Sequence, residues 1–109
     1  MKDWEVLSDK LADFSRERDW DQFHNAKDLA LALGIEAAEL NALFLWKQAE
    51  EVDIEKLKEE LADVFCYGLM IARKFDLDIQ EIVSDKIALN AVKYPIDKAR
   101  GTAKKYNEL

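Results

Sequence analysis

The chain has 109 residues, half of them hydrophobic, which is enough for one compact domain over residues 1–109 but not for two. Its 23 Asp and Glu outnumber its 16 Lys and Arg, and the net charge of −7 argues against a nucleic-acid partner. The only cysteine, Cys66, excludes an intrachain disulfide and a Cys/His zinc pattern. These features favour a reducing, cytoplasmic setting.

The sequence also gives no indication of a membrane partner. The first five residues include acids, and no apolar core of a signal peptide follows them. The longest uncharged run, residues 64–72, is far shorter than the ~20 residues that span a bilayer. We therefore expect a soluble protein.

Helix is the expected conformation in the first half of the chain, because only three Gly and one Pro interrupt the whole sequence. Apolar residues recur at helical spacing over residues 3–18, which predicts a half-buried amphipathic helix. Residues 19–25 mix aromatic and polar cap-type residues without a sustained period, which indicates a loop. Asn25 can cap a second helix that runs to about Lys47.

Two more helices are predicted in the second half. Asp53 can cap a third helix that ends near Phe75. The pair Asp78 and Glu81 forms a capping-box pattern at the start of a fourth helix, which must stop before Pro95. A basic C-terminal tail, residues 96–109, follows. The sequence therefore predicts an all-α fold of the four-helix-bundle type.

The second and third predicted helices are apolar on more than one face, which a four-helix monomer cannot bury completely. We therefore expect part of this surface to pack against a second subunit, in a homodimer or in a homotetramer built as a dimer of dimers.

Two acidic pairs, Glu36/Glu39 and Glu60/Asp63, have members three residues apart and therefore on one face of a helix. This spacing alone means little, because a random arrangement of 23 acids among 109 residues would give about five such pairs and the sequence has four. Their surroundings distinguish them. Glu36 and Glu39 are the only charged residues between Leu29 and Trp46, and Asp63 is the only one between Leu61 and Ala72.

Carboxylates in apolar surroundings are costly unless a proton or a cation compensates them. Antiparallel packing of the second and third helices would bring the four acids together in an oxygen-only site suited to Mg²⁺ or Mn²⁺. The alternative is a solvated acidic face. A di-iron bundle is nearly excluded, because it needs two Glu-x-x-His motifs and the only histidine, His24, lies outside any such motif. We interpret His24 as a hydrogen-bonding loop residue.

Several motifs resemble the MazG-like nucleotide pyrophosphohydrolases. Residues 33–40 (LGIEAAEL), 44–47 (FLWK) and 59–64 (EELADV) are similar to the paired Glu-x-x-Glu and Glu-x-x-Asp motifs of that family. Residues 18–24 (RDWDQFH), 90–95 (NAVKYP) and 104–106 (KKY) further resemble its dCTP-hydrolysing branch. The similarity covers nearly the whole chain in the same order.

The resemblance implies an enzyme that cleaves a nucleoside triphosphate to the monophosphate and pyrophosphate. It implies that Glu36, Glu39, Glu60 and Asp63 hold Mg²⁺, with Mn²⁺ as a substitute, and that these four residues are the catalytic centre. Metal and carboxylate would neutralise the phosphate charge and activate water, as this reaction requires.

Seven other residues are candidate substrate contacts. Lys86, Asn90 and Tyr94 are four residues apart on one stripe of the fourth helix, although Lys86 could be a plain surface charge and Tyr94 a packing residue. Trp20 and Trp46 could stack on a base, or belong to the core. Tyr67 lies one turn after Asp63, with core packing as the alternative. Lys47 could meet phosphates across a subunit boundary, as could the basic tail.

The resemblance implies that the substrate is dCTP or a modified dCTP, removed from the nucleotide pool. One departure weakens the preference for cytosine: the family branch often carries a histidine where this chain has Leu11. The alternatives are dUTP hydrolysis and, in a different class, a non-catalytic helical dimer that binds a partner or a metal.

Overall fold

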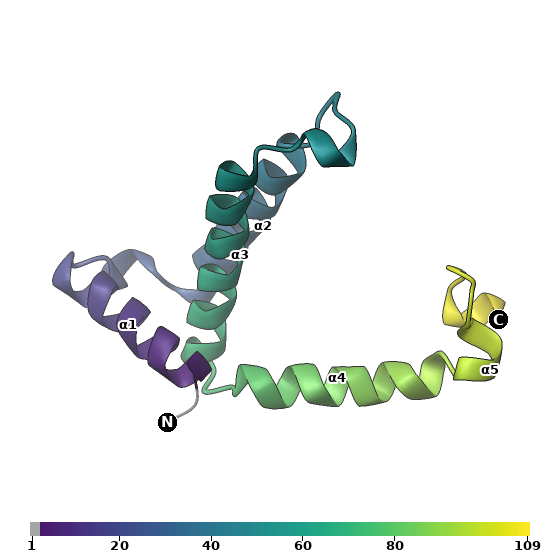
Figure 1. Cartoon of the computed structure of the whole chain (residues 1–109). Helices are drawn as coiled ribbons and strands as arrows, with labels where there is room; N and C mark the ends of the chain where they lie inside the picture. The colour runs from purple at the N-terminus through teal and green to yellow at the C-terminus, as the bar shows by residue number, and fades with distance from the viewer. Residues whose placement is uncertain (1–2) are drawn as a thin grey trace. The chain divides into compact units, whose positions relative to one another are not determined.

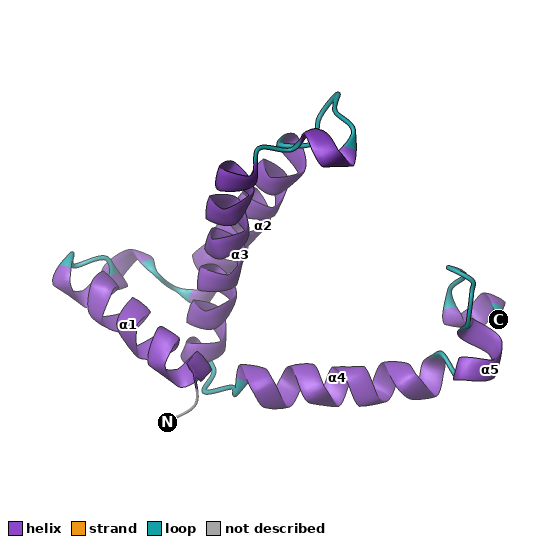
Figure 2. Ribbon diagram, viewed as in Figure 1, coloured by secondary structure: helices purple, strands orange, loops and turns teal. Residues whose placement is uncertain are grey.

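The protein is described by a computed structural model that covers residues 3–109; Met1 and Lys2 of the expected domain lie outside the described residues. Residues 3–109 form five α-helices and three short 3-10 helices and contain no strand (Figures 1 and 2). The predicted all-α class is therefore confirmed. None of these helices is long and apolar enough to cross a membrane.

The chain divides into two compact units, Met1–Leu77 and Asp78–Leu109. The first unit contains α1 (Asp3–Glu17), α2 (Ala26–Ala42) and α3 (Ile54–Lys74), with short 3-10 helices at Asp21–Phe23 and Ala49–Glu51. The second unit contains α4 (Ile79–Lys93), α5 (Ile96–Ala99) and a 3-10 helix at Tyr106–Glu108.

Three helices begin at the residues that the sequence predicts. The side chain of Asn25 accepts a hydrogen bond from the backbone N–H of Asp28 at 2.9 Å and so caps α2. Asp53 caps α3 in the same way. Asp78 accepts a hydrogen bond from the N–H of Glu81 at 3.1 Å and caps α4. Each cap satisfies a backbone donor that lacks a partner within its helix.

The end predicted for the second helix is wrong by five residues, because α2 stops at Ala42 rather than near Lys47. From Leu43 onward the backbone makes tighter bonds three residues back, such as Leu43 N–H to the Leu40 carbonyl at 3.2 Å. Trp46 then adopts a left-handed conformation with φ of +63°. Residues 43–46 therefore form a turn, where the apolar pattern predicted that the helix would continue.

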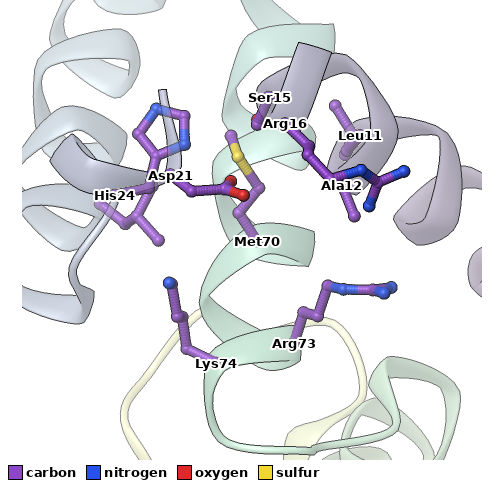
Figure 3. Close-up of a pocket in the computed structure, with 10 residues that line it drawn as sticks. Leu11, Ala12, Ser15, Arg16, Asp21, His24, Met70, Arg73 and Lys74 are labelled. Carbon is purple, nitrogen blue, oxygen red and sulfur yellow. The ribbon is translucent and has the colours of Figure 1, made fainter. Parts of the chain in front are cut away.

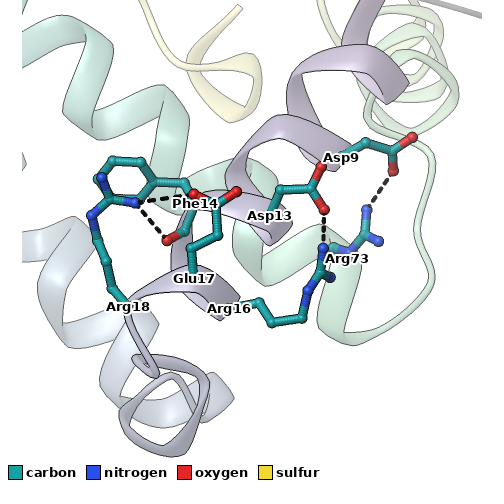
Figure 4. A network of polar contacts seen from close by, with 7 residues as sticks. All are labelled: Asp9, Asp13, Phe14, Arg16, Glu17, Arg18 and Arg73. Carbon is teal, nitrogen blue, oxygen red and sulfur yellow. Dashed lines mark hydrogen bonds and ion pairs between the residues drawn. The ribbon is translucent and has the colours of Figure 1, made fainter.

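The core of the first unit lies where α2 and α1 each pack against α3 (Figure 1). Leu29 on α2 is 1% exposed, and Leu69 and Ala72 on α3 are 6% and 4% exposed. The Arg73 guanidinium ties α3 to α1, because it donates to the Asp9 carboxylate at 2.8 Å (Figure 4). It also donates to the Ser8 hydroxyl at 3.2 Å. This packing fixes the face of α3 that α2 meets.

Candidate functional site

The acidic residues of α2 and α3 meet at the contact between these helices. Glu36 on α2 and Glu60 and Asp63 on α3 each offer one carboxylate oxygen, and these three oxygens lie within 4.8 Å of one another. Because three residues on a helix advance by nearly a full turn, Glu60 and Asp63 share the face that α2 covers. The packing thus brings together three of the four predicted metal ligands.

Two oxygens of this cluster have no compensating partner. Glu36 Oε2 and Glu60 Oε2 are buried, and neither makes a hydrogen bond with any group in residues 3–109. A buried carboxylate oxygen without a donor is destabilising when it is charged. The cluster therefore needs a proton or a cation.

The pKa values of the cluster also indicate that it needs a proton or a cation. Burial raises the pKa of Glu36 to about 7, and the neighbouring Glu39, Glu60 and Asp63 carboxyl groups add to this shift. Burial also raises the pKa of Glu60. A divalent cation would take the place of the proton that these groups otherwise hold. The donor set, carboxylate oxygen throughout, fits Mg²⁺ or Mn²⁺.

Glu39 and Tyr67 lie at the border of the cluster. Glu39 is exposed and lies outside the group of three close oxygens, although it acts on the pKa of Glu36. Tyr67 is half-buried, and burial together with the Glu36 and Asp63 carboxylates raises the pKa of its phenol. Tyr67 thus keeps its proton and remains a hydrogen-bond donor at neutral pH.

Trp46 and Lys47 lie in the turn that follows α2. The Trp46 side chain is 93% exposed, and Lys47 is exposed as well. A tryptophan this exposed contributes nothing to a core, so the core alternative for Trp46 is not seen in this chain. Its indole remains accessible to a planar ligand or to another protein surface.

Trp20 has a different environment, since two aromatic rings meet it edge to face. Its ring centroid lies 5.7 Å from Phe14 and 6.3 Å from His24, and its side chain is 43% exposed. The Arg18 guanidinium covers Phe14 at 3.7 Å from the ring centroid (Figure 4). These contacts hold Trp20 in one orientation at the surface. The His24 imidazole ring makes one of these two ring contacts with Trp20.

A cavity of about 440 Å³ lies between α1, α2, α3 and the Trp20 loop, residues 18–24 (Figure 3). Its wall combines polar and charged groups with apolar ones: Leu11, Ala12, Ser15, Arg16, Asp21, His24, Leu29, Met70, Arg73 and Lys74. Figure 3 shows the Asp21 carboxylate directed toward the middle of this space. The sequence analysis did not single out Asp21, Arg73 or Lys74 as site residues, although Asp21 lies in the motif of residues 18–24. They come together only through tertiary packing.

The cavity and the carboxylate cluster lie along the same two helices. On α2, Glu36 lies seven positions after Leu29 in the cavity wall, and on α3 Met70 in that wall lies seven positions after Asp63. At a rise of 1.5 Å per residue, both separations correspond to roughly 10 Å along the helix. A ligand of nucleotide length could therefore reach from one to the other.

The predicted stripe of α4 belongs to the second unit. Lys86 is exposed, and Asn90 and Tyr94 are half-buried. The Tyr94 N–H donates to the Asn90 carbonyl at 2.8 Å and closes the helix. The Tyr94 ring meets Tyr106 edge to face, with 6.1 Å between centroids.

Comparison with known proteins gives consistent matches. Residues 31–109 match the model of the MazG-like family. The dCTP pyrophosphatase 1 proteins of Mus musculus and Homo sapiens are each 39% identical over 90% of this chain and 62% of the relative. The chain thus spans less than two thirds of the length of these curated relatives.

A crystal structure of a pyrophosphatase from Archaeoglobus fulgidus is similar in fold, with a TM-score of 0.77 and 32% identity. The alignment covers 87% of this chain and 94% of that one. The family match extends over most of the chain and includes the Glu36, Glu60 and Asp63 cluster. The chain therefore belongs to the MazG-like family.

Proposed function

We propose that this protein hydrolyses a nucleoside triphosphate to the monophosphate and pyrophosphate at the cluster of Glu36, Glu39, Glu60 and Asp63. The observation that carries the proposal is a pair of buried oxygens on α2 and α3, Glu36 Oε2 and Glu60 Oε2, which have no hydrogen-bond partner within residues 3–109. Such a pair is suited to a cation that a triphosphate would share. The pyrophosphatase names of the relatives support the reaction type.

The proposed cofactor is Mg²⁺, with Mn²⁺ as a substitute, held by these four carboxylates. Bound there, the ion would neutralise phosphate charge and lower the pKa of the attacking water. Tyr67 keeps its phenol proton beside the carboxylates and would donate it in a hydrogen bond to a phosphate oxygen. Lys47 and Lys86 are exposed and are proposed to supply positive charge to the remaining phosphate oxygens.

The favoured substrate is dCTP or a modified dCTP, with the base in the 440 Å³ cavity beside the Trp20 loop. Cytosine presents an amino group where uracil presents a carbonyl, so the Asp21 carboxylate would accept a hydrogen bond from cytosine and repel uracil. Trp20, held by Phe14 and His24, would offer a stacking surface in the same loop as Asp21. The roughly 10 Å offset along α2 and α3 leaves room for sugar and α-phosphate.

Asn90 and Tyr94 are proposed to contact the sugar or the phosphates, and Trp46, in the turn after α2, is proposed to stack on a base. Residues 1–109 are proposed to act as one catalytic domain. Exposed aliphatic side chains occur in both units, including Leu31 and Ile35 on α2, Val92 on α4 and Ile96 on α5, which are 57%, 59%, 79% and 80% exposed. So much exposed apolar surface favours a homodimer or homotetramer. A cytoplasmic location fits a role in the nucleotide pool.

A substrate panel tests this proposal. Purified protein is incubated with Mg²⁺ and dCTP, 5-methyl-dCTP, dUTP or dTTP, and kcat/KM is measured for each from pyrophosphate release. The expected order places dCTP and 5-methyl-dCTP above dUTP and dTTP. Equal rates on all four would contradict the cytosine preference, and no release from any of them would contradict the enzyme and favour a non-catalytic helical dimer.

A further inference from the structure

The helix α2 carries two stripes of mostly apolar side chains, and α3 covers one of them (Figure 1). The members of the covered stripe are separated by four and three residues in turn and are buried or half-buried: Leu29, Leu33, Glu36 and Leu40. A second stripe has the same alternating spacing and begins two residues later: Leu31, Ile35, Ala38, Ala42 and Leu45. Because two residues on a helix advance by about 200°, the second stripe lies on the side of α2 that faces away from α3.

This second stripe, which we call the α2 seam, is exposed along its whole length. Leu31, Ile35 and Leu45 are 57%, 59% and 57% exposed, and Ala38 and Ala42 are exposed as well. Leu45 follows the end of α2, but its N–H donates to the Ala42 carbonyl at 3.2 Å and extends the seam by one tighter turn. Apolar residues that alternate at four and three positions are typical of a helix that packs along another helix. The α2 helix therefore needs a second partner.

The order of side-chain sizes along the seam fits a second copy of the same seam. In an antiparallel pair centred on Ala38, Ile35 of each copy lies opposite Ala42 of the other, and Leu31 lies opposite Leu45. The large Ile35 side chain then fills the space beside the small Ala42, and the two Ala38 residues allow a close approach at the centre. A twofold axis repeats every contact, so the pair is closed.

The two ends of α2 are complementary in charge in the same arrangement. Lys27 lies one turn before Leu31 and is exposed. At the other end, the turn after α2 leads to the exposed acids Glu50 and Glu51. An antiparallel pair brings the lysine end of one copy to the acidic end of the other, whereas a parallel pair would place like charges together.

The seam is also large enough for a specific contact. It runs roughly 20 Å from Leu31 to Leu45 on a helix that is ~10 Å wide, and it presents on the order of 400 Å² of accessible surface. Trp46, which follows the seam and is 93% exposed, adds on the order of 150 Å². Two copies would together bury about 1,000 Å², the size at which specific interfaces begin.

We propose that the α2 seam is the contact between two copies of this chain, which pair in antiparallel orientation. This inference rests on the assembly in the proposed function and names its surface. Glu39 is exposed and follows Ala38, so the second copy would shield it from water on that side. Trp46 lies where the pair places Leu31 of the second copy, which would support one face of the indole and leave the other face for a base.

Disulfide trapping in a Cys66→Ala background tests the pairing and its orientation. Ala38→Cys should give a covalent dimer on oxidation, because the two thiols meet at the centre of the pair. Leu31→Cys alone should not, because its two copies lie roughly 20 Å apart, but a mixture of Leu31→Cys and Leu45→Cys proteins should. Ala30→Cys, on the same helix and beside the seam, is the control and should remain monomeric on non-reducing gels.

Sedimentation equilibrium provides a second measurement. Ile35→Asp should raise the Kd of the dimer at least about 10-fold and leave the helical CD signal intact, because it places a charge in an apolar contact. Ala30→Asp should leave the Kd unchanged.

Three results would overturn the proposal: no cross-link through Ala38→Cys, a cross-linked homodimer of Leu31→Cys, or an unchanged Kd in Ile35→Asp. A monomeric protein whose Tm falls in Ile35→Asp would also overturn it, because residues of the same chain would then cover the seam. These measurements need neither nucleotide nor metal. Their failure would leave the proposed hydrolysis intact, and a lack of pyrophosphate release would leave the contact intact.

Discussion

Glu36 on α2 and Glu60 on α3 each bury one carboxylate oxygen, and neither oxygen makes a hydrogen bond with a group in residues 3–109. One carboxylate oxygen from each of Glu36, Glu60 and Asp63 lies within 4.8 Å of the other two. The charged carboxylates destabilise the folded protein when no metal is bound, and a bound cation would remove this destabilisation. The predictions for Glu36, Glu39, Glu60 and Asp63 rest on this effect.

Replacing Glu36 with Gln should stabilise the metal-free protein and abolish its activity. An amide can donate a hydrogen bond to Glu60 and removes one negative charge, so Tm without metal should rise. The same change removes a proposed Mg²⁺ ligand, so kcat should fall on the order of 100-fold or more. Calorimetry and pyrophosphate release measure the two effects.

The matched control for this variant is Glu59→Gln, which makes the same chemical change on an exposed position next to Glu60. It should leave Tm and kcat nearly unchanged. A Glu36→Gln protein that retains activity would show that the metal site is misassigned.

The stability of the metal-free protein should fall as pH rises from about 4.5 to about 7. The pKa of Glu36 is raised from 4.5 in the unfolded chain to about 7 in the folded protein, so the folded state binds the proton more tightly across this interval. The contribution is therefore fully present below pH 4.5 and is lost as the pH passes about 7. Thermal unfolding across this range with a chelator present measures it.

Saturating Mg²⁺ should reverse this loss, because the cation binds the deprotonated carboxylates of the folded protein only. Glu36→Gln should show a smaller pH dependence than the unmodified protein. If the Tm measured in the presence of the chelator rises steadily between pH 4.5 and 7, the assignment is contradicted.

Asp21→Asn should weaken the preference for cytosine. The carboxylate in the cavity wall is proposed to accept a hydrogen bond from the cytosine amino group, and an amide can donate to the uracil carbonyl as readily as it accepts from cytosine. We expect the ratio of kcat/KM for dCTP to that for dUTP to fall by about 10-fold. Asp85→Asn, at an exposed position of α4, should keep the original ratio. An unchanged ratio in Asp21→Asn would place the base elsewhere.

Leu29→Ala should destabilise the protein by about 2–4 kcal/mol, because this side chain is 1% exposed and its truncation leaves a cavity between the helices. Leu31→Ala, two residues along the same helix and 57% exposed, should cost less than about 1 kcal/mol in the isolated chain. Urea unfolding of both variants measures the difference. Equal losses would mean that α2 buries a different face.

The proposed oligomer predicts a dimer or tetramer in sedimentation at micromolar concentration. Val92→Asp, which places a charge on a side chain that is 79% exposed, should shift the distribution toward smaller species. Gln80→Asp on an exposed polar position of α4 should not. A monomeric unmodified protein would contradict the proposal.

The fold was predictable to the extent that local patterns determine it. The caps Asn25, Asp53 and Asp78 act within three residues, so the sequence alone located the starts of three helices. The end of α2 was not predictable, because the apolar pattern continues to Trp46 while the backbone turns at Leu43. The fold of residues 96–109 was missed for a similar reason, since it depends on a ring contact twelve residues away in sequence.

The candidate site was also predictable only in part. The acids were recognisable because an apolar setting makes uncompensated charge costly, and the packing of α2 on α3 brings Glu36 to Glu60 and Asp63. The motif of residues 18–24 was recognisable, but the sequence did not show that it lines a cavity. Asp21 in this motif and Lys74 at the end of α3 come to one cavity only through tertiary packing.

The most direct test of the central claim is the identity of the phosphorus products. The protein is mixed with dCTP and Mg²⁺, and ³¹P NMR follows the reaction, with a parallel sample that contains a chelator. The account predicts dCMP and pyrophosphate in equal amounts, and no reaction in the chelator sample. Release of orthophosphate with dCDP, or turnover that continues without metal, would contradict it.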